Sequence, residues 1–236
     1  MVFELTPRFV ARLLMANLAV LVSCNVAVQL VFLVTDHDNI MGLRPFFDMS
    51  GEWNAPAIYS GFLILINGLF LALIGFRSRI ANKSKWIHWY ILSVIFLYLS
   101  SDEVFSFHER LGAPVRDALH SSGLLYFAWV IPGGIFTLVV LVASLSWLRR
   151  LETATRRLML SAGTVYVTGA IGIEMLGGWR YERVKLGLGL NDPWFMLLST
   201  CEETLEIAGM SLMLFTLIRH ATSAFGPIRS PLPRFH

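Results

Sequence analysis

The sequence predicts an all-α fold: a polytopic transmembrane bundle of six helices with both termini in the cytoplasm. The first observation is composition, because 56% of the 236 residues are hydrophobic, 15% are charged and the mean hydropathy is +0.63. A soluble domain of this size needs more polar surface. The second is that several apolar runs approach 20 residues, the length that crosses about 30 Å of hydrocarbon. The third is the placement of charged residues, which gather between these runs.

Six apolar runs are expected to be the spans: residues 9–34, 57–76, 86–101, 124–148, 157–179 and 194–218. They are apolar on all faces, which is atypical of amphipathic surface helices. An open sheet in lipid is excluded because its edge amides and carbonyls would lack partners. Pro132, in "IPGG", is expected to kink the fourth span. We expect one transmembrane domain, residues 1–220, followed by an irregular cytoplasmic tail, 221–236.

The first span also contains "LVSC", residues 21–24, which matches a bacterial lipobox. Cleavage there would leave a lipidated Cys24. The apolar run continues to Val34, whereas a cleaved signal normally gives way to polar sequence. The favoured expectation is therefore an uncleaved first helix.

Basic residues mark one side of the predicted bundle. This side holds 13 of the 19 Lys and Arg residues: Arg8, Arg12, Arg77, Arg79, Lys83, Lys85, Arg149, Arg150, Arg156, Arg157, Arg219, Arg229 and Arg234. The positive-inside rule places it in the cytoplasm. This placement explains the pI of about 9.1 without a nucleic-acid partner.

Acidic residues gather on the opposite side, where 14 of the 16 Asp and Glu residues lie. Four segments bring carboxylates to one membrane depth: Glu52, "SSDEVFSFHE" at 100–109, Glu174, and "CEETLE" at 201–206. Asp102, Ser106 and Glu109 share a face if the third span continues as helix through Glu109. Small residues at Gly163, Gly169, Gly172 and Gly209 favour close packing of the last two spans, so that Glu174 and Glu206 would face each other.

Ionisable groups at membrane depth are functional candidates that need a partner. Three partners are considered: a divalent metal, shared protons, and the basic residues Arg110, Arg180, Arg183 and Lys185. The residues favoured as metal ligands are Glu103, His108, Glu109, Glu174, Glu203 and Glu206. Asp102, Glu202 and Glu52 are expected to contact these ligands without binding the metal themselves. Oxygen-rich ligation with one imidazole favours manganese, iron, calcium or zinc.

Several familiar chemistries lack their motifs. The sequence contains no paired Glu-x-x-His, no HExxH, no GxSxG and no histidine arrangement suited to bis-histidine haem. No nucleotide motif is seen, and no catalytic residue is assigned.

Five segments together resemble a family of uncharacterised bacterial multipass membrane proteins with no established activity. They are "GEWNAPAIYS", "LYLSSDEVFSFHERL", "GLLYFAWVIP", "EMLGGW" and "EETLEIAGM", and the similarity runs from about Phe46 to Leu217. The resemblance implies a bacterial inner-membrane protein and carries over no site residue.

The expected function is a carboxylate and histidine site near the periplasmic face. If the protein is an enzyme, metal-assisted hydrolysis or oxidation of a lipid-soluble substrate is expected, because the site lies near the headgroups. One alternative is an accessory subunit of a larger membrane complex, with other membrane proteins as partners besides the lipid bilayer. Another is a proton- or cation-coupled transporter, although the inner halves of the spans hold almost no ionisable groups.

Overall fold

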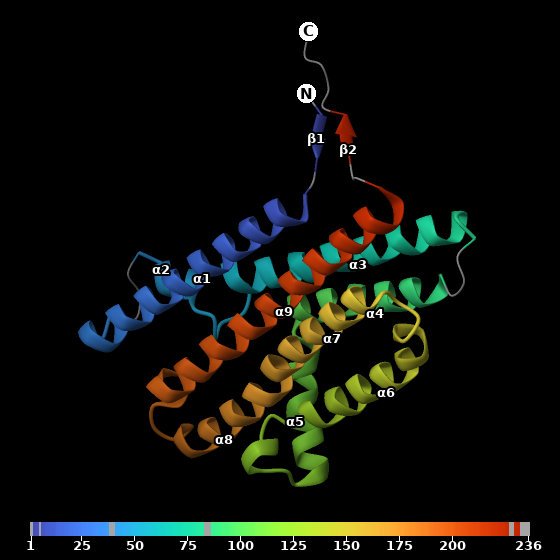
Figure 1. Cartoon of the computed structure of the whole chain (residues 1–236). Helices are drawn as coiled ribbons and strands as arrows, with labels where there is room; N and C mark the ends of the chain where they lie inside the picture. Colours follow the sequence, from blue (N-terminus) through green and yellow to red (C-terminus); the bar gives the residue numbers. More distant parts are fainter. Residues whose placement is uncertain (1, 5, 38–40, 83–85, 227–228, 232–236) are drawn as a thin grey trace.

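The computed structural model describes residues 2–4, 6–37, 41–82, 86–226 and 229–231, and almost all of them are helical (Figure 1). The elements are β1 (Val2–Glu4), α1 (Pro7–Thr35), α2 (Leu43–Phe47), α3 (Ala55–Ile80), α4 (Ile87–Phe105), α5 (Phe107–Leu119), the 3-10 turn η1 (Gly123–Leu125), α6 (Val130–Leu148), α7 (Thr153–Val167), the π-helical segment η2 (Thr168–Ile173), α8 (Glu174–Val184), the 3-10 turn η3 (Gly189–Asn191), α9 (Pro193–Phe225) and β2 (Arg229–Pro231).

Three long helices start with the same local chemistry. Thr6, Asn54 and Asp192 cap α1, α3 and α9, and each side chain accepts a hydrogen bond from the amide three residues later. A proline follows within the first turn in all three, where its missing amide hydrogen costs no helical bond. These starts are therefore encoded locally.

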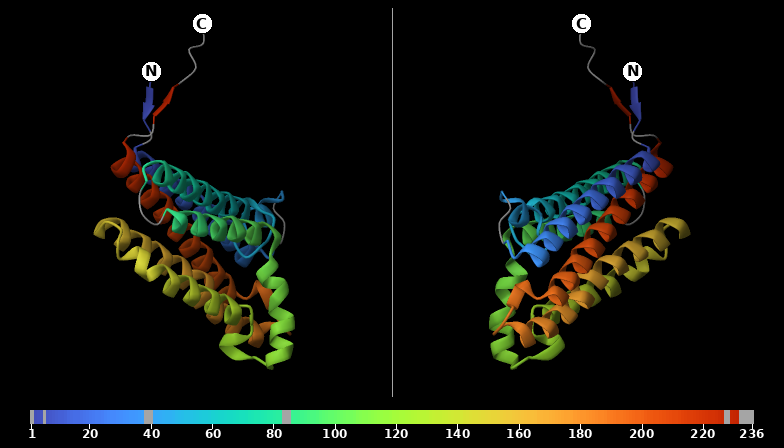
Figure 2. Two further views of the ribbon diagram at one scale, coloured as in Figure 1. Left: turned by 90° about the vertical axis from the view of Figure 1, so that its right-hand side faces the viewer. Right: turned by 90° about the vertical axis from the view of Figure 1, so that its left-hand side faces the viewer.

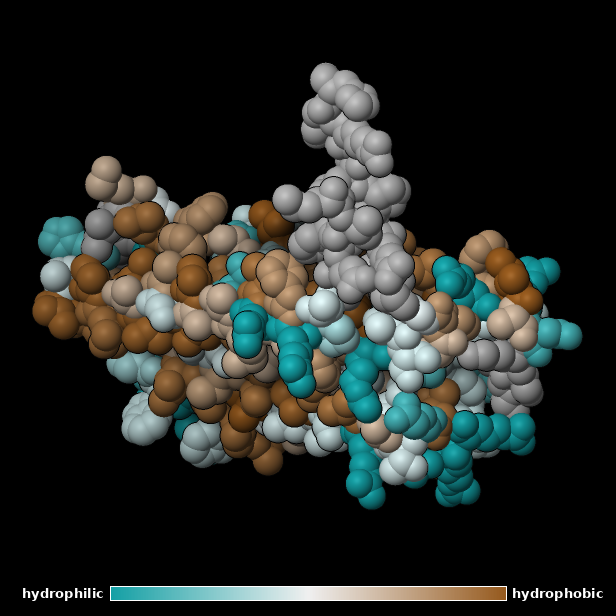
Figure 3. Space-filling model, turned by 45° about the horizontal axis from the view of Figure 1, so that its top comes forward, coloured by the Kyte–Doolittle hydropathy of each residue, from teal (hydrophilic) through white to brown (hydrophobic). Residues whose placement is uncertain are grey.

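Helix length and composition indicate a membrane protein. Four helical segments of the described chain can cross a membrane: α1, α3, α6 and the continuous run Thr153–Val184 formed by α7, η2 and α8. The bent pair α4 and α5 makes a fifth if it is counted as one span. The 33-residue α9 is not among them; it carries Glu202, Glu203 and Glu206. On the face shown in Figure 3, hydrophobic side chains dominate the left-hand part, and hydrophilic side chains gather towards the lower right.

The centre of the bundle is α9. Helices α1, α3, α7 and α8 and the segment η2 all contact it, and α1 and α7 run beside it in Figure 1. Ile64 and Leu71 of α3 and Ile207 and Leu217 of α9 are completely buried between them. In contrast, α6 is mostly exposed, because only 11% of its most apolar stretch of 18 residues is buried. It therefore lies at the periphery of the bundle.

Helix α4 lies against α3 along a stripe of small residues. Gly61 and Gly68, seven residues apart, face Val104 and Leu97 so closely that an added Cβ would meet them at 3.1 Å. Ser100 and Ser93 donate hydrogen bonds of 2.8 Å to the carbonyls of these two glycines. Small residues and interhelical hydroxyl bonds of this kind hold membrane helices together.

Several predicted boundaries need correction. The third span was expected to end at residue 101, but α4 continues to Phe105 and α5 then leaves it at an angle of 80° (Figure 2). The continuous helix through Glu109, on which a face shared by Asp102 and Glu109 depended, does not form. Helix α6 starts at Val130, not at residue 124, so Pro132 lies in its first turn and the expected kink is wrong. Helix α9 continues to Phe225, five residues past the predicted end of the domain.

The two ends of the chain lie together. β1 pairs with β2 in antiparallel register, with Val2 opposite Pro231 and Glu4 opposite Arg229. This short ribbon uses part of the tail that was predicted to be irregular. Residues 227–228 and 232–236 of that tail, and Lys83 and Lys85 of the basic side, lie outside the described residues.

Candidate functional site

All nine predicted site residues line one cavity of about 640 Å³. They comprise eight carboxylates and one imidazole: Glu52, Asp102, Glu103, His108, Glu109, Glu174, Glu202, Glu203 and Glu206. The four acidic segments therefore converge. Among the described residues that line the cavity, Arg116 is the one Lys or Arg, and its guanidinium lies 4.6 Å from the centre of the Tyr126 ring.

The break between α4 and α5 brings His108 back towards Asp102. Ser106 has a positive φ of 50°, and its hydroxyl donates a 2.7 Å hydrogen bond to Glu52. The Asp102 carboxylate accepts a 2.9 Å bond from the His108 amide. Asp102, Ser106 and Glu109 consequently do not share a helical face, because the helix that would align them ends between them.

Two hydrogen bonds and one ring contact connect α4 to α8 along the cavity wall. Asp102 Oδ2 lies 2.8 Å from Nδ1 of His108, and the His108 ring centre lies 4.6 Å from that of Trp129. Trp129 Nε1 donates a 2.8 Å hydrogen bond to Glu174. With Nδ1 protonated towards Asp102, Nε2 of His108 is the nitrogen that accepts a proton or a ligand.

The irregular segment η2 comes directly before Glu174. A π-helical turn changes the direction of the side chains that follow it, and such turns are frequent at functional sites. Close packing against α9 occurs here: a Cβ added to Gly169 would lie 2.7 Å from the Glu202 carbonyl oxygen, and one added to Gly209 would lie 2.7 Å from the Tyr166 amide. These two glycines confirm the expected close approach. Gly163 and Gly172 have no such contact.

Three glutamates of α9, Glu202, Glu203 and Glu206, line the cavity. Glu206 is only 8% exposed. Oε2 of Glu203 is buried and has no hydrogen-bond partner in the described part of the chain. Glu103, Glu52 and Glu174 from other elements line the same cavity. Carboxylates placed together in a poorly hydrated site are costly to ionise, because like charges repel and burial disfavours the charged form.

A family model described as a domain of unknown function, DUF8692, matches residues 10–221. The chain belongs to this family. The match spans every residue of the cavity lining. No curated protein and no solved structure matches the chain.

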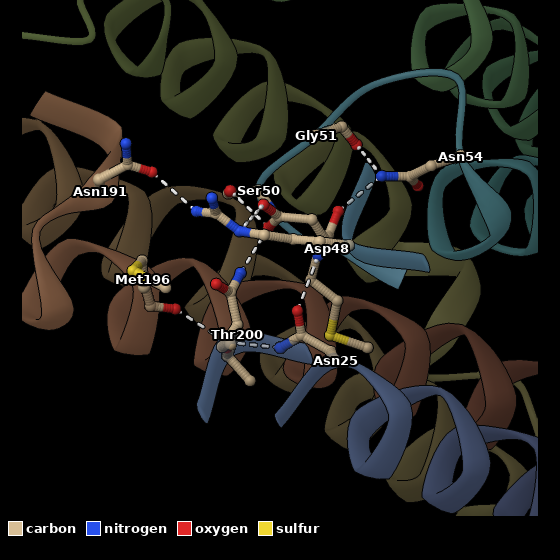
Figure 4. A network of polar contacts seen from close by, with 11 residues as sticks. Asn25, Asp48, Ser50, Gly51, Asn54, Asn191, Met196 and Thr200 are labelled. Atoms are coloured by element: carbon tan, nitrogen blue, oxygen red, sulfur yellow. Dashed lines mark hydrogen bonds and ion pairs between the residues drawn. The ribbon is translucent and has the colours of Figure 1, made fainter. Parts of the chain in front are cut away.

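Glu52 enters the cavity on the segment that connects α1 to α3. Figure 4 shows how this segment is held: Asn25 of α1 donates a 2.9 Å bond to Thr200 of α9 and accepts a 3.0 Å bond from the Met49 amide. Asp48 accepts a 2.8 Å bond from Gln29 of α1. The position of Glu52 therefore depends on two buried polar side chains of α1, Asn25 and Gln29, and on the contact of Asn25 with Thr200 of α9.

Six aromatic rings are also part of the cavity wall, and the sequence analysis missed this role. They are Phe127, Trp129, Phe136, Tyr166, Tyr181 and Phe195. Tyr181 packs here with its ring centre 5.5 Å from that of Phe195. Its spacing of seven residues from Glu174 places both on one helical face, a signal that was readable in the sequence.

Three of the four basic residues considered as partners of the acids have other contacts. Arg180 forms two 2.7 Å hydrogen bonds with Asp192, Arg183 stacks on Trp179, and Lys185 lies over Tyr126. The Arg180 guanidinium holds the pKa of Asp192 below its ordinary value of 3.8. The cavity carboxylates gain no counter-charge from these three bases.

The arrangement of donors does not form a ready metal site. Within the described ranges, no three His, Cys, Asp or Glu side chains lie together as they would around one metal ion. The donor set suits a hard or borderline ion, but its members are spread over the cavity wall. Metal binding by the predicted residues stays a prediction.

Proposed function

We propose that this is a six-span protein of the bacterial inner membrane, with both termini cytoplasmic, whose cavity near the periplasmic face binds a cation. The pairing of β1 with β2 supports an even number of crossings, because the two chain ends lie side by side. The four membrane-length segments and the bent α4–α5 pair make five. Helix α9 is long enough to supply the sixth.

Charge placement supports the orientation. Arg77 and Arg79 lie in the last turn of α3, and Arg219 of α9 lies 3.8 Å from Glu152, just before α7. The cavity residues lie at the other ends of these helices. The positive-inside rule then places the basic end in the cytoplasm and the cavity at the opposite face.

The main support for cation binding is that eight carboxylates line one cavity. Among the described lining residues, Arg116 is the one Lys or Arg, and its guanidinium is stacked on Tyr126. Buried carboxylates without counter-charges are costly, and the cost falls when they share protons or bind a cation. A cation held here would lie near the headgroup layer, where it can meet molecules dissolved in the membrane.

The test is a screen of inorganic and organic cations against the melting temperature of the purified protein in detergent. We expect at least one cation to raise the Tm saturably, because a ligand that binds only the folded state stabilises it. The effect should be lost in the double variant Glu203→Gln/Glu206→Gln. It should persist in Asp117→Asn, which changes an exposed carboxylate of α5 outside the cavity lining. A screen without any stabilising cation would refute the proposal.

A second candidate, metal-assisted hydrolysis or oxidation of a lipid-soluble substrate, is favoured by the Asp102–His108 contact of 2.8 Å. Metal-binding histidines usually donate their other ring N–H to a carboxylate in this way. Manganese, iron, calcium and zinc suit the donors. Elemental analysis of protein purified without chelators should then find near-stoichiometric metal in the wild type and in His120→Ala, but not in His108→Ala or Glu206→Gln.

Transport across the whole membrane receives less support. Leu71 and Ile74 of α3 and Leu217 of α9 are fully buried in the half of the bundle nearer the basic end. At these positions the contact between α3 and α9 is apolar, whereas the carboxylates of the cavity lie at the other end of the bundle. The accessory-subunit alternative predicts a stable larger assembly without bound ligand, which native mass spectrometry would reveal.

A further inference from the structure

We infer that the cavity takes an amphiphile with a protonated amine: the ammonium group lies among the glutamates, and an apolar tail leaves past α6 towards lipid. This inference rests on the proposed cation-binding function and names the class of cation. Four independent features carry it: the size of the cavity, its aromatic wall, its uncompensated buried carboxylates, and the exposure of its apolar side.

The size of the cavity suits a molecule better than an ion. Its volume of about 640 Å³ lies within the range of roughly 300–1,000 Å³ that is typical of small-molecule sites. The described carboxylates and His108 do not gather in threes around one point. Donors that are spread over a wall contact a ligand with several atoms of its own more easily than a single ion.

The aromatic wall adds attraction that is specific to organic cations. Trp129, Tyr166 and Tyr181 line the cavity together with three phenylalanines. The faces of such rings attract alkylammonium groups, and rings combined with carboxylates are the usual way in which proteins recognise them. Trp129 lies between His108 and Glu174, so a ring is placed within the acidic cluster.

The buried glutamates of α9 indicate where the amine binds. Glu206 is 8% exposed and lines the cavity, while the neighbouring Oε2 of Glu203 is buried without a hydrogen bond in the described structure. A buried acceptor without a donor is costly. An ammonium group carries up to three donors and a positive charge, so it satisfies both carboxylates at once.

The apolar side of the cavity provides the route for the tail. Phe136 of α6 lines the cavity and is 43% exposed, and Leu190 lines it and is 53% exposed. Helix α6 is peripheral, and its neighbouring side chains Ile135 and Val139 are exposed as well. The outer surface of a membrane-length helix such as α6 faces lipid, so a tail that leaves beside Phe136 stays in an apolar medium.

The test measures the Tm of the purified full-length protein in maltoside micelles against octylammonium, with octanol and octanoate as equal-length neutral and anionic controls. We expect a saturable rise with octylammonium alone. Glu206→Gln should weaken the apparent affinity by at least about tenfold, because a charge-assisted hydrogen bond is lost. Asp117→Asn should leave it unchanged, and Phe136→Leu should weaken it by about two- to fivefold.

The tail has its own readout. Butyl-, hexyl- and octylammonium should bind with increasing affinity, by up to about fourfold for each added CH₂ buried. Any general effect of the amines on the detergent is removed by subtracting the Tm shift of Glu206→Gln from that of the wild type in the same micelles. An affinity that does not depend on chain length would overturn the placement of the tail beside α6.

The outcomes separate this inference from the function on which it rests. Stabilisation by Mn²⁺, Fe²⁺, Zn²⁺ or Ca²⁺ that EDTA reverses, without any effect of octylammonium, would overturn the amine and leave cation binding in place. Equal shifts with octanol and octylammonium would also overturn the amine, because charge would then have no role. No shift with any cation, inorganic or organic, would overturn both proposals.

Discussion

Glu206 is a buried carboxylate of the cavity wall, and the completely buried Ile207 follows it in sequence. A buried carboxylate of this kind is expected to lower the stability of the ligand-free protein and to serve in ligand binding. We predict that Glu206→Gln raises the Tm of ligand-free protein by about 2–4 °C, which corresponds to about 1 kcal/mol for a chain of this size. Differential scanning fluorimetry checks this, with Asp117→Asn as the neutral control. A fall in Tm would show that Glu206 is a structural carboxylate.

Asp192 is the opposite case, a buried carboxylate with a full set of partners. It caps α9 and pairs with Arg180, and the ion pair lowers its pKa from 3.8. A lowered folded pKa contributes stability that is present above the unfolded value of 3.8 and is lost as the pH falls through the folded value. We predict that the wild type loses more stability than Asp192→Asn as the pH falls below about 4. If the stabilities of the wild type and of Asp192→Asn fall in parallel as the pH decreases, the ion pair with Arg180 does not lower the pKa of Asp192.

At the scale of elements, the contact of α7 and η2 with α9 depends on the absence of side-chain atoms. A Cβ at Gly209 would lie 2.7 Å from the Tyr166 amide nitrogen and 2.9 Å from the Ala162 carbonyl oxygen. We predict that Gly209→Ala separates the two helices and lowers stability by about 1–3 kcal/mol, the usual cost of overpacking. Gly163→Ala is the matched control: its Cβ meets nothing within 4 Å, so it should be neutral or slightly stabilising. Thermal unfolding of both variants decides this, and equal effects would contradict the contact.

The break between α4 and α5 depends on one residue in the left-handed region. Ser106 has φ 50° and ψ 46° and also bonds to Glu52. Both Ser106→Gly and Ser106→Ala lose the hydroxyl, but only glycine adopts this conformation without cost. We therefore predict that Ser106→Gly is more stable than Ser106→Ala by about 1 kcal/mol, as measured by chemical unfolding. The reverse order would indicate a continuous helix here.

At the scale of the whole molecule, the number of crossings decides the orientation of the ends. Six crossings place both termini on one side, and the β1–β2 pairing agrees with this. We predict that alkaline phosphatase fused after His236 is inactive and that green fluorescent protein fused there is fluorescent. Alkaline phosphatase inserted between Ser121 and Ser122, at the cavity end, should be active. Active enzyme at His236 would refute the six-span topology.

Much of this architecture is readable from local sequence. The helical class, the membrane-length runs and the polar caps with a following proline depend on residues that are neighbours along the chain, and the structure shows all three. The carboxylates selected from their depth, such as Glu174 and Glu206, do line one cavity. Hydropathy determines depth in a membrane residue by residue, so depth needs no knowledge of helix order.

Only the tertiary structure determines which side chains the acidic residues contact. The contacts of Glu52 with Ser106 and of Trp129 with Glu174 join residues that are 54 and 45 positions apart. These features follow from the order and rotation of helices, which a hydropathy pattern does not encode because every apolar face is equally soluble in lipid. The aromatic wall and the close contacts at Gly169 and Gly209 were decided at the same level, where helices meet.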